Sequence, residues 1–482
     1  MHPLIQKLSL KPGYIFFLVP LFVLIILRLL GFDGMTGQDS YAYVDYAKKI
    51  VEGIKTGTHP GDFFWPAGYP LLGVLLKPLI PFMDLSLQLI GVISLALTLH
   101  LIYKLLIQLH GPEQKNSPLA YLFIFGLFTP YFLRQSLLTM SDLPAAGIFT
   151  GGIYYTRYYV QNGQLKHLSL AVLCFFYSAF IRFPAGVIAL PFLLWLIFSW
   201  VKHGHPFKQL IVLLIPLGIG ALYFFFKEGS VFLTDRSWSI NYLFTTVFQT
   251  REGIIKTTFP NIIMVFSPFA HYGFMIPGFI FILLGLKEIR TNQLLWLIAA
   301  SYLLYALFIG SYEGQQKRHL IMAFPLVLIL CFAGFNLVIT KISAHYHSVL
   351  FILLLGVQLI LSLLSFQGVY SRSKLERTIT KDLFTRFKTA NQDIILYSFD
   401  IDVALKSRGV PMDFYNFWMQ DFNEFIAGAY VLFNEHQLKG QWKGTRVMHN
   451  WENLKAWHHL TVVTEYPGQW SLYQIGPGKI KE

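Results

Sequence analysis

Two acidic residues stand directly before apolar segments, where a carboxylate could take part in catalysis. Asp39 follows a glycine-rich turn in GFDGMTGQDSYAYVDYA, and Asp142 lies in TMSDLPAAG, where Pro144 is typical of a helix start. The simplest interpretation of each is a helix N-cap, which accepts hydrogen bonds from free backbone amides. The alternative is a general base, because a hydroxyl is a poor nucleophile until a carboxylate takes its proton. If Asp39 and Asp142 share one site, they could also hold a divalent cation such as Mg²⁺ or Mn²⁺.

Several basic residues are expected on the same face of the membrane as these acids. They are Arg134, Arg182 in IRFPAG, and Lys317 and Arg318 in SYEGQQKRHL. A single arginine at a helix end more often extends its charge to the interface than binds a ligand. Several together could bind the phosphate groups of a donor, because Arg and Lys make charge-assisted hydrogen bonds to phosphate oxygens.

Aromatic and polar residues beside these groups are the candidates for a substrate pocket. The segment HPGDFFWPAGYP brings two rings to the membrane surface, where Trp and Tyr are enriched, so an interfacial anchor is the simpler interpretation there. The residues that we expect in the pocket are Tyr43, Trp65, Tyr69, Glu313 and His319.

Most of the chain requires lipid as its solvent. It has 482 residues, of which 55% are hydrophobic and 13% charged, and a soluble fold could not bury that much apolar surface. We expect an α-helical polytopic membrane protein with about eleven membrane-spanning helices. The spans are expected at 14–30, 85–109, 118–133, 141–160, 168–182, 184–201, 207–227, 271–286, 293–310, 319–340 and 347–366.

The C-terminal part has a different composition. Residues 370–482 are an ordinary polar mixture with 14 Lys/Arg and 12 Asp/Glu, so a boundary is expected near 366–371, after a membrane module over 1–369. Short apolar runs predict a small α/β domain, with strands over 393–398, 429–433, 459–464 and 470–474 and a helix over 400–407. The basic residues of the membrane module lie in scattered short loops rather than in one stripe, which disfavours nucleic-acid binding.

Charge asymmetry predicts the orientation in the membrane. With the N-terminus in the cytoplasm, the cytoplasmic loops carry 11 basic residues and 2 acidic ones, as the positive-inside rule requires. An odd number of spans then places the C-terminal domain outside the cytoplasm, together with two long loops over 31–84 and 228–270. The proline-containing run Gly68–Phe82 in the first loop is expected as a partly embedded helix. Any chemistry is therefore expected on the outer face.

Four segments together resemble the type C glycosyltransferases, and in particular the bacterial members similar to protein mannosyltransferases and the lipid A aminoarabinose transferase. GQDSYAYVDYA resembles the acidic motif of the first loop in that family, and WPAGYPLLGVLLKPL resembles its embedded helix. TMSDLPAAG resembles the acidic motif before a helix, and QKRHLIMAFPLVLIL resembles a basic helix start. Ser40 stands where many relatives have a second acid, and His319 where they have Tyr.

The resemblance implies a fold, a reaction and its partners. It implies Asp39 as the catalytic carboxylate, Asp142 as a supporting acid and Arg318 as a donor-phosphate ligand. The reaction would transfer a hexose or pentose, with inversion, from a polyprenyl-phosphate donor to a lipid, glycan or protein acceptor at the cell (inner) membrane. Two other functions stay open: a flippase or transporter of lipid-linked sugars, which would be expected to carry charges at mid-membrane and internal repeats, and a non-enzymatic scaffold.

Overall fold

The computed structural model describes residues 12–206, 238–250, 253–313, 316–388 and 394–479, with the single positions 211, 215, 218, 219 and 222. The described residues divide into two compact units. The first, the helical unit, spans 1–34, 46–244 and 259–367, and the second, the sheet unit, spans 35–45, 245–258 and 368–482. Two helices, α3 (Gly37–Thr56) and α16 (Ala344–Phe387), contribute residues to both units.

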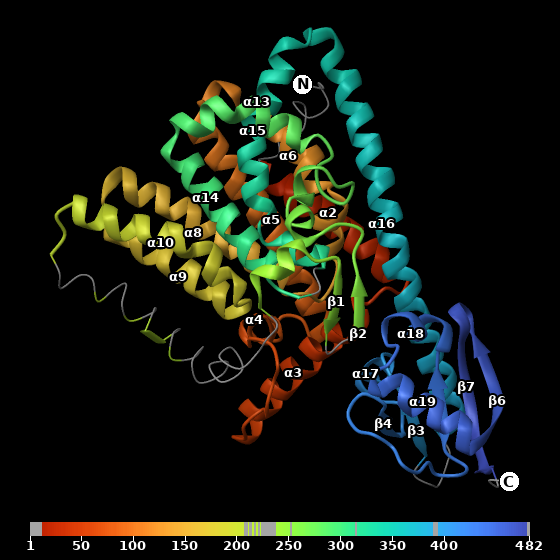
Figure 1. The fold of residues 1–482 in the computed structure, drawn as a ribbon. Coiled ribbons are helices and arrows are strands. Elements are labelled where there is room, and N and C mark those ends of the chain that lie inside the picture. Colours follow the sequence, from red (N-terminus) through yellow and green to blue (C-terminus); the bar gives the residue numbers. More distant parts are fainter. Residues whose placement is uncertain are drawn as a thin grey trace. The chain divides into compact units, whose positions relative to one another are not determined.

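The helical unit consists mainly of apolar helices (Figure 1). Its longer members are α2 (Pro12–Leu29), α5 (Met83–His110), α8 (Asp142–Asn162), α9 (Leu165–Ile181), α10 (Pro184–Lys202), α13 (Gly278–Thr291), α14 (Gln293–Gly310), α15 (Phe324–Lys341) and the start of α16. Shorter ones are α4 (Gly68–Leu76), α6 (Asn116–Leu122), α7 (Pro130–Ser136), α12 (Asn261–Met264) and the 3₁₀ turn η6 (Lys317–Ile321).

Six described helices are long and apolar enough to cross a membrane, so the chain is an integral membrane protein: α2, α5, α10, α14, α15 and α16. Helix α5 lies inside the unit, with 72% of its most apolar window buried, whereas the corresponding window of α2 is 17% buried. Helix α5 packs against α2, α4, α7 and α8, and α8 packs against α9 and α10. The predicted number of about eleven spans stays a prediction.

The predicted run over 118–133 differs from the helices that form there. Helix α6 passes into the π-helical turn Phe123–Leu127, and after a break α7 begins at Pro130. The reason is that a proline fits the first turn of a helix but cannot donate a hydrogen bond in its interior. The predicted run over 207–227 falls largely outside the described residues. Lys7, Lys11 and Lys208, three of the basic residues in the predicted cytoplasmic loops, fall wholly outside them.

The sheet unit contains a five-stranded sheet in the order β4-β3-β5-β7-β6. The strands are β3 (Ile395–Ser398), β4 (Asp413–Asn416), β5 (Tyr430–Phe433), β6 (His458–Tyr466) and β7 (Trp470–Gly478). The pairs β3–β4 and β3–β5 are parallel, and β5–β7 and β6–β7 are antiparallel. Helices α17 (Asp402–Ser407), α18 (Glu435–Gln441) and α19 (Arg446–Trp457) accompany the sheet, and its core includes Phe433, stacked on Trp451.

The sheet unit also contains two segments from earlier in the chain. One is 35–45, with the first turns of α3, and the other holds the hairpin of β1 (Val247–Thr250) and β2 (Gly253–Lys256). Gly253 has φ +93°, and a Cβ there would lie 2.3 Å from the Gln441 carbonyl oxygen in α18, so this close approach requires glycine. Helix α16 runs without a break through the predicted boundary at 366–371.

Candidate functional site

A buried ion pair in the helical unit joins Asp142 to Arg182. Asp142 is the first residue of α8 and is fully buried, and its Oδ1 lies 3.0 Å from Nε of Arg182, which directly follows α9. Arg182 Nη1 also donates to Ser141 Oγ over 3.3 Å. Neither side chain at the start of α8 makes a capping hydrogen bond, so the N-cap interpretation does not account for Asp142. The carboxylate instead compensates a guanidinium charge.

The turn η6 contains two more of the predicted residues, Arg318 and His319, and His319 lies near Arg182 of this pair. Tyr305 of α14 donates its hydroxyl hydrogen to the His319 carbonyl oxygen. Burial, with the positive charges of Arg182 and Arg318, holds the pKa of His319 well below its usual value. The imidazole is therefore neutral near pH 7. Its Nδ1 is buried and makes no hydrogen bond to any described residue, which leaves one polar atom available to a ligand.

Lys317, the first residue of η6, contacts a cluster of aromatic side chains. Its Nζ lies 2.6 Å from His271 Nε2 and 6.0 Å from the centre of the Tyr272 ring. Burial and the Lys317 charge lower the pKa of His271 to about 4, so this imidazole accepts the ammonium hydrogen near pH 7. The guanidinium of Arg134 lies 4.5 Å from the centre of the Tyr131 ring, and that ring is 5.5 Å from His271.

The helical unit therefore brings together all four predicted phosphate ligands in two neighbouring groups. Arg182 and Arg318 act on His319, and Lys317 and Arg134 contact the aromatic cluster of Tyr131, His271 and Tyr272. The two groups meet in η6, where Lys317 directly precedes Arg318. Low dielectric strengthens the attraction between such cations and an anion, so the arrangement can bind phosphate.

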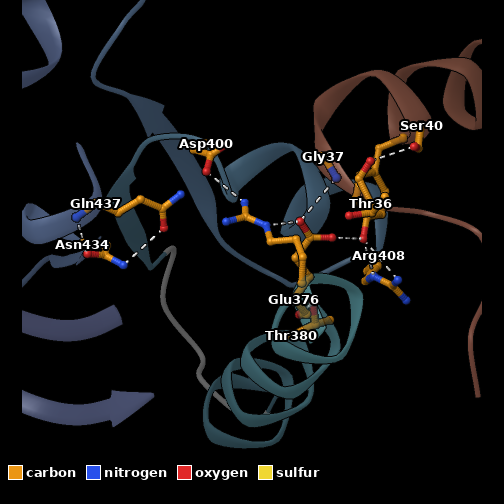
Figure 2. Close-up of polar contacts among 11 residues, drawn as sticks. Thr36, Gly37, Ser40, Glu376, Thr380, Asp400, Arg408, Asn434 and Gln437 are labelled. Carbon is orange, nitrogen blue, oxygen red and sulfur yellow. Dashed lines mark hydrogen bonds and ion pairs between the residues drawn. The ribbon is translucent and has the colours of Figure 1, made fainter. Parts of the chain in front are cut away.

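Asp39 belongs to the sheet unit. It is partly exposed, in the first turn of α3, where the positive end of the helix dipole favours a negative charge. Tyr43, one turn further along, is 2% exposed. Ser40 is fully buried and donates to the Thr36 carbonyl oxygen over 2.7 Å (Figure 2). Asp39 and Asp142 belong to different units, so their pairing in one site stays a prediction.

The backbone segments that precede the two acids are bonded to each other within the helical unit. The Thr139 amide donates to the Gly34 carbonyl over 3.1 Å, and Gln88 of α5 donates to the Leu137 carbonyl over 2.6 Å. Gln88 Oε1 in turn accepts from Arg28 Nε over 2.6 Å. Gly34 has φ +78°, and a Cβ there would lie 2.1 Å from Gln88 Nε2. Only glycine fits this position.

Sequence reasoning missed several of these residues. Arg28 also pairs with Asp84 over 2.6 Å, and polar residues at the ends of apolar helices, such as these two and Gln88, are a signal that could have found them. His271 is the first residue of the predicted span over 271–286, but the helix there, α13, begins only at Gly278.

Other predicted pocket residues have local roles in the structure. Tyr69 is fully buried and donates its hydroxyl hydrogen to the Leu87 carbonyl over 3.0 Å, which fastens α4 to α5. Trp65 is partly exposed, with its ring 4.5 Å from that of Phe64, and Glu313 is partly exposed just before η6. The place of Tyr43, Trp65, Tyr69 and Glu313 in a substrate pocket stays a prediction.

The described residues do not favour a metal centre at Asp142, because its carboxylate already faces a guanidinium. Within the described ranges, no group of three or more His, Cys, Asp or Glu side chains is placed to hold a metal ion. The divalent cation stays a prediction.

Comparison with known proteins relates this chain to solved structures. No protein-family model and no curated protein sequence matches it. ArnT from Cupriavidus metallidurans in the apo state matches with a TM-score of 0.56 and 9% identity over 95% of this chain and 97% of that chain. The same protein bound to undecaprenyl phosphate matches with a TM-score of 0.55 and 10% identity, over 96% and 98% of the two chains.

A third solved structure is the apo form of the Archaeoglobus fulgidus oligosaccharyltransferase. It matches with a TM-score of 0.47 and 11% identity over 93% of this chain and 69% of that chain. The ArnT matches show that the chain shares the fold of that protein over nearly its whole length, and this confirms the predicted resemblance at the level of the fold.

Proposed function

We propose that this chain is a membrane glycosyltransferase that moves a sugar from a polyprenyl-phosphate-linked donor to an acceptor hydroxyl at the extracytoplasmic face of the cell (inner) membrane. The observation that carries the proposal is the group of cationic side chains around η6, set in a fold shared with ArnT, which has been solved bound to undecaprenyl phosphate. The acceptor is a lipid, a glycan or a protein.

The cationic group would bind the donor phosphate and stabilise it as it leaves. Arg182, Arg318, Lys317 and Arg134 supply hydrogen-bond donors to the phosphate oxygens, and these bonds strengthen as negative charge develops during bond cleavage. Asp142 holds Arg182 at 3.0 Å and reduces the cost of burying its charge in the absence of donor.

Asp39 would act as the general base. As the acceptor oxygen bonds to the anomeric carbon, its proton passes to the Asp39 carboxylate. The bond between the anomeric carbon and the phosphate oxygen breaks at the same time, and its electron pair leaves with the polyprenyl phosphate. Attack from the face opposite to the leaving group inverts the anomeric configuration.

The test is transfer of a radiolabelled sugar from a polyprenyl-phosphate donor by purified protein. Asp39→Asn should abolish transfer, because the amide cannot take the proton, and should leave the protein folded. Asp62→Asn is the matched control, since Asp62 is an exposed acid in the same loop, and it should keep wild-type activity. Wild-type activity in Asp39→Asn would remove the proposed base.

A further inference from the structure

A buried carboxylate in the sheet unit accepts hydrogen bonds from the start of α3 (Figure 2). Glu376, on α16, is 1% exposed. Its Oε1 accepts from the Gly37 amide over 3.4 Å and from Arg372 Nε over 2.7 Å, and its Oε2 accepts from the Tyr41 hydroxyl over 2.8 Å. Both oxygens are therefore used, and two of the three donors belong to α3.

Two arginines complete this arrangement. Arg372 Nη2 donates to Asp400 Oδ2 over 2.9 Å, so its charge is shared between two carboxylates. Arg408 donates from Nη2 to the Tyr41 hydroxyl oxygen over 3.1 Å, and its guanidinium lies 5.4 Å from the centre of the Tyr41 ring. A carboxylate this deeply buried is stable only when such donors surround it.

The direction of the Tyr41 hydrogen bond follows from its surroundings. Tyr41 is fully buried, and burial together with the Glu376 charge raises its pKa far above the usual value. The phenol therefore keeps its proton and donates it to Glu376, while its oxygen accepts from Arg408. The hydroxyl links α16 to the segment that follows α17.

The two bonded positions of α3 lie on either side of Asp39. Gly37 is two residues before Asp39 and Tyr41 is two residues after it, and the pair is one helical turn apart. Gly37 has φ +66°, a left-handed conformation that glycine adopts without a steric cost. Fixing both positions fixes the direction in which the first turn presents Asp39.

We propose that Glu376 is a positioning residue for the transfer reaction: it holds the first turn of α3 through Gly37 and Tyr41 and thereby orients the Asp39 carboxylate toward the acceptor hydroxyl. This inference rests on the proposed function. Glu376 touches neither substrate, and it acts only through Asp39. Catalysis depends steeply on such placement, and a shift of about 1 Å can reduce the rate by about 100-fold.

The test measures kcat and donor KM for Glu376→Gln and Tyr41→Phe in the full-length protein. Both variants keep the shape of the side chain and remove a charge or a hydroxyl, and each should lower kcat by about 10- to 100-fold. Donor KM should change by less than about twofold, because the proposed phosphate ligands belong to the helical unit. Glu435→Gln is the matched control, since Glu435 pairs with Lys455 over 2.9 Å on the exposed surface of the same unit and should leave kcat unchanged.

Two further measurements separate orientation from simple stability. In the Asp39→Asn background, adding Glu376→Gln should cause no further loss of the residual rate, because both changes affect the same step. Amide hydrogen exchange over residues 37–45 should also become faster in Glu376→Gln, while exchange over β5 and β7 stays at the wild-type rate. This second readout needs no activity.

The outcomes distinguish this inference from the proposed function. Wild-type activity in Asp39→Asn would overturn the proposed function. An inactive Asp39→Asn beside wild-type kcat in both Glu376→Gln and Tyr41→Phe would overturn only the role of Glu376. A loss of kcat no larger than the loss of folded protein, measured by size-exclusion chromatography, would likewise reduce Glu376 to a structural residue.

Discussion

Breaking the buried pair between Arg182 and Asp142 should destabilise the helical unit more than removing both charges together. The two atoms lie 3.0 Å apart, and Asp142 is fully buried while the Arg182 side chain is 15% exposed. With an effective dielectric constant of about 20, their attraction is about 5 kcal/mol, and each charge costs several kcal/mol to bury. Removing one partner leaves the other charge buried and uncompensated, at a cost of about 3–5 kcal/mol.

The experiment is a double-mutant cycle with Asp142→Asn, Arg182→Gln and the combined variant. Thermal unfolding of the purified protein in detergent provides the measurement. Each single change of about 3 kcal/mol should lower the melting temperature by several degrees, since roughly 2–4 °C correspond to 1 kcal/mol in a domain of moderate size. The combined variant should be more stable than either single variant, because it leaves no unpaired charge.

Additive effects would refute this reasoning. If the combined variant lost the sum of the two single losses, the two charges would not be coupled, and the proximity of Asp142 to Arg182 would contribute nothing to stability. The same three proteins can be assayed for transfer. If Asp142 holds Arg182 in place to bind the donor phosphate, these substitutions should change donor KM.

Two more predictions follow from close packing and from a buried acid. A Cβ on Gly334 in α15 would lie 1.8 Å from the Phe281 carbonyl oxygen in α13. Gly334→Ala should therefore reduce the free energy of unfolding by about 1–3 kcal/mol and lower the melting temperature. Gly356→Ala, where a Cβ meets nothing within 4 Å, should not lower it. Burial raises the pKa of Asp402 from 3.8 to about 6 despite its hydrogen bond from Asn416, so the folded protein binds this proton more tightly than the unfolded chain. Stability should therefore fall as pH rises from about 4 to 6, by up to about 3 kcal/mol, and Asp402→Asn should melt higher than wild type at pH 7.5; equal pH dependence of melting in the two proteins would contradict this.

Local sequence patterns predicted the elements of the fold better than their contacts. Several elements begin and end within a few residues of the expected ranges, among them α5, α15, β3, β5, β6 and β7. Apolar periodicity and proline positions determine such boundaries from the neighbouring residues alone. Strand β4 and the hairpin β1–β2 were missed. Their residues are only partly buried, so they carry little apolar signal.

The candidate site was predictable in its residue types and less so in its pairings. Four cations were expected to bind phosphate. Lys317 and Arg318 belong to η6, Arg182 acts on His319 of that turn, and Arg134 contacts Tyr131, whose ring lies near His271. The sequence could not show that Asp142 pairs with Arg182, 40 residues away, or that Glu376 accepts from Tyr41, whose separation along the chain is 335 residues. Such pairs depend on tertiary packing, and residue spacing within one helix does not predict which helices pack together.

The uninterrupted course of α16 has a practical consequence for protein engineering. Its 44 residues extend over about 66 Å, roughly twice the thickness of a hydrocarbon core, so the helix continues far beyond its lipid-facing part. A reporter fused near residue 370, or a stop codon placed there, would truncate α16 and remove Glu376 together with the residues after it. The Gly37 amide and the Tyr41 hydroxyl would then lose their acceptor. A loss of activity in the shortened protein could therefore come from the altered start of α3, and not only from the missing C-terminal domain.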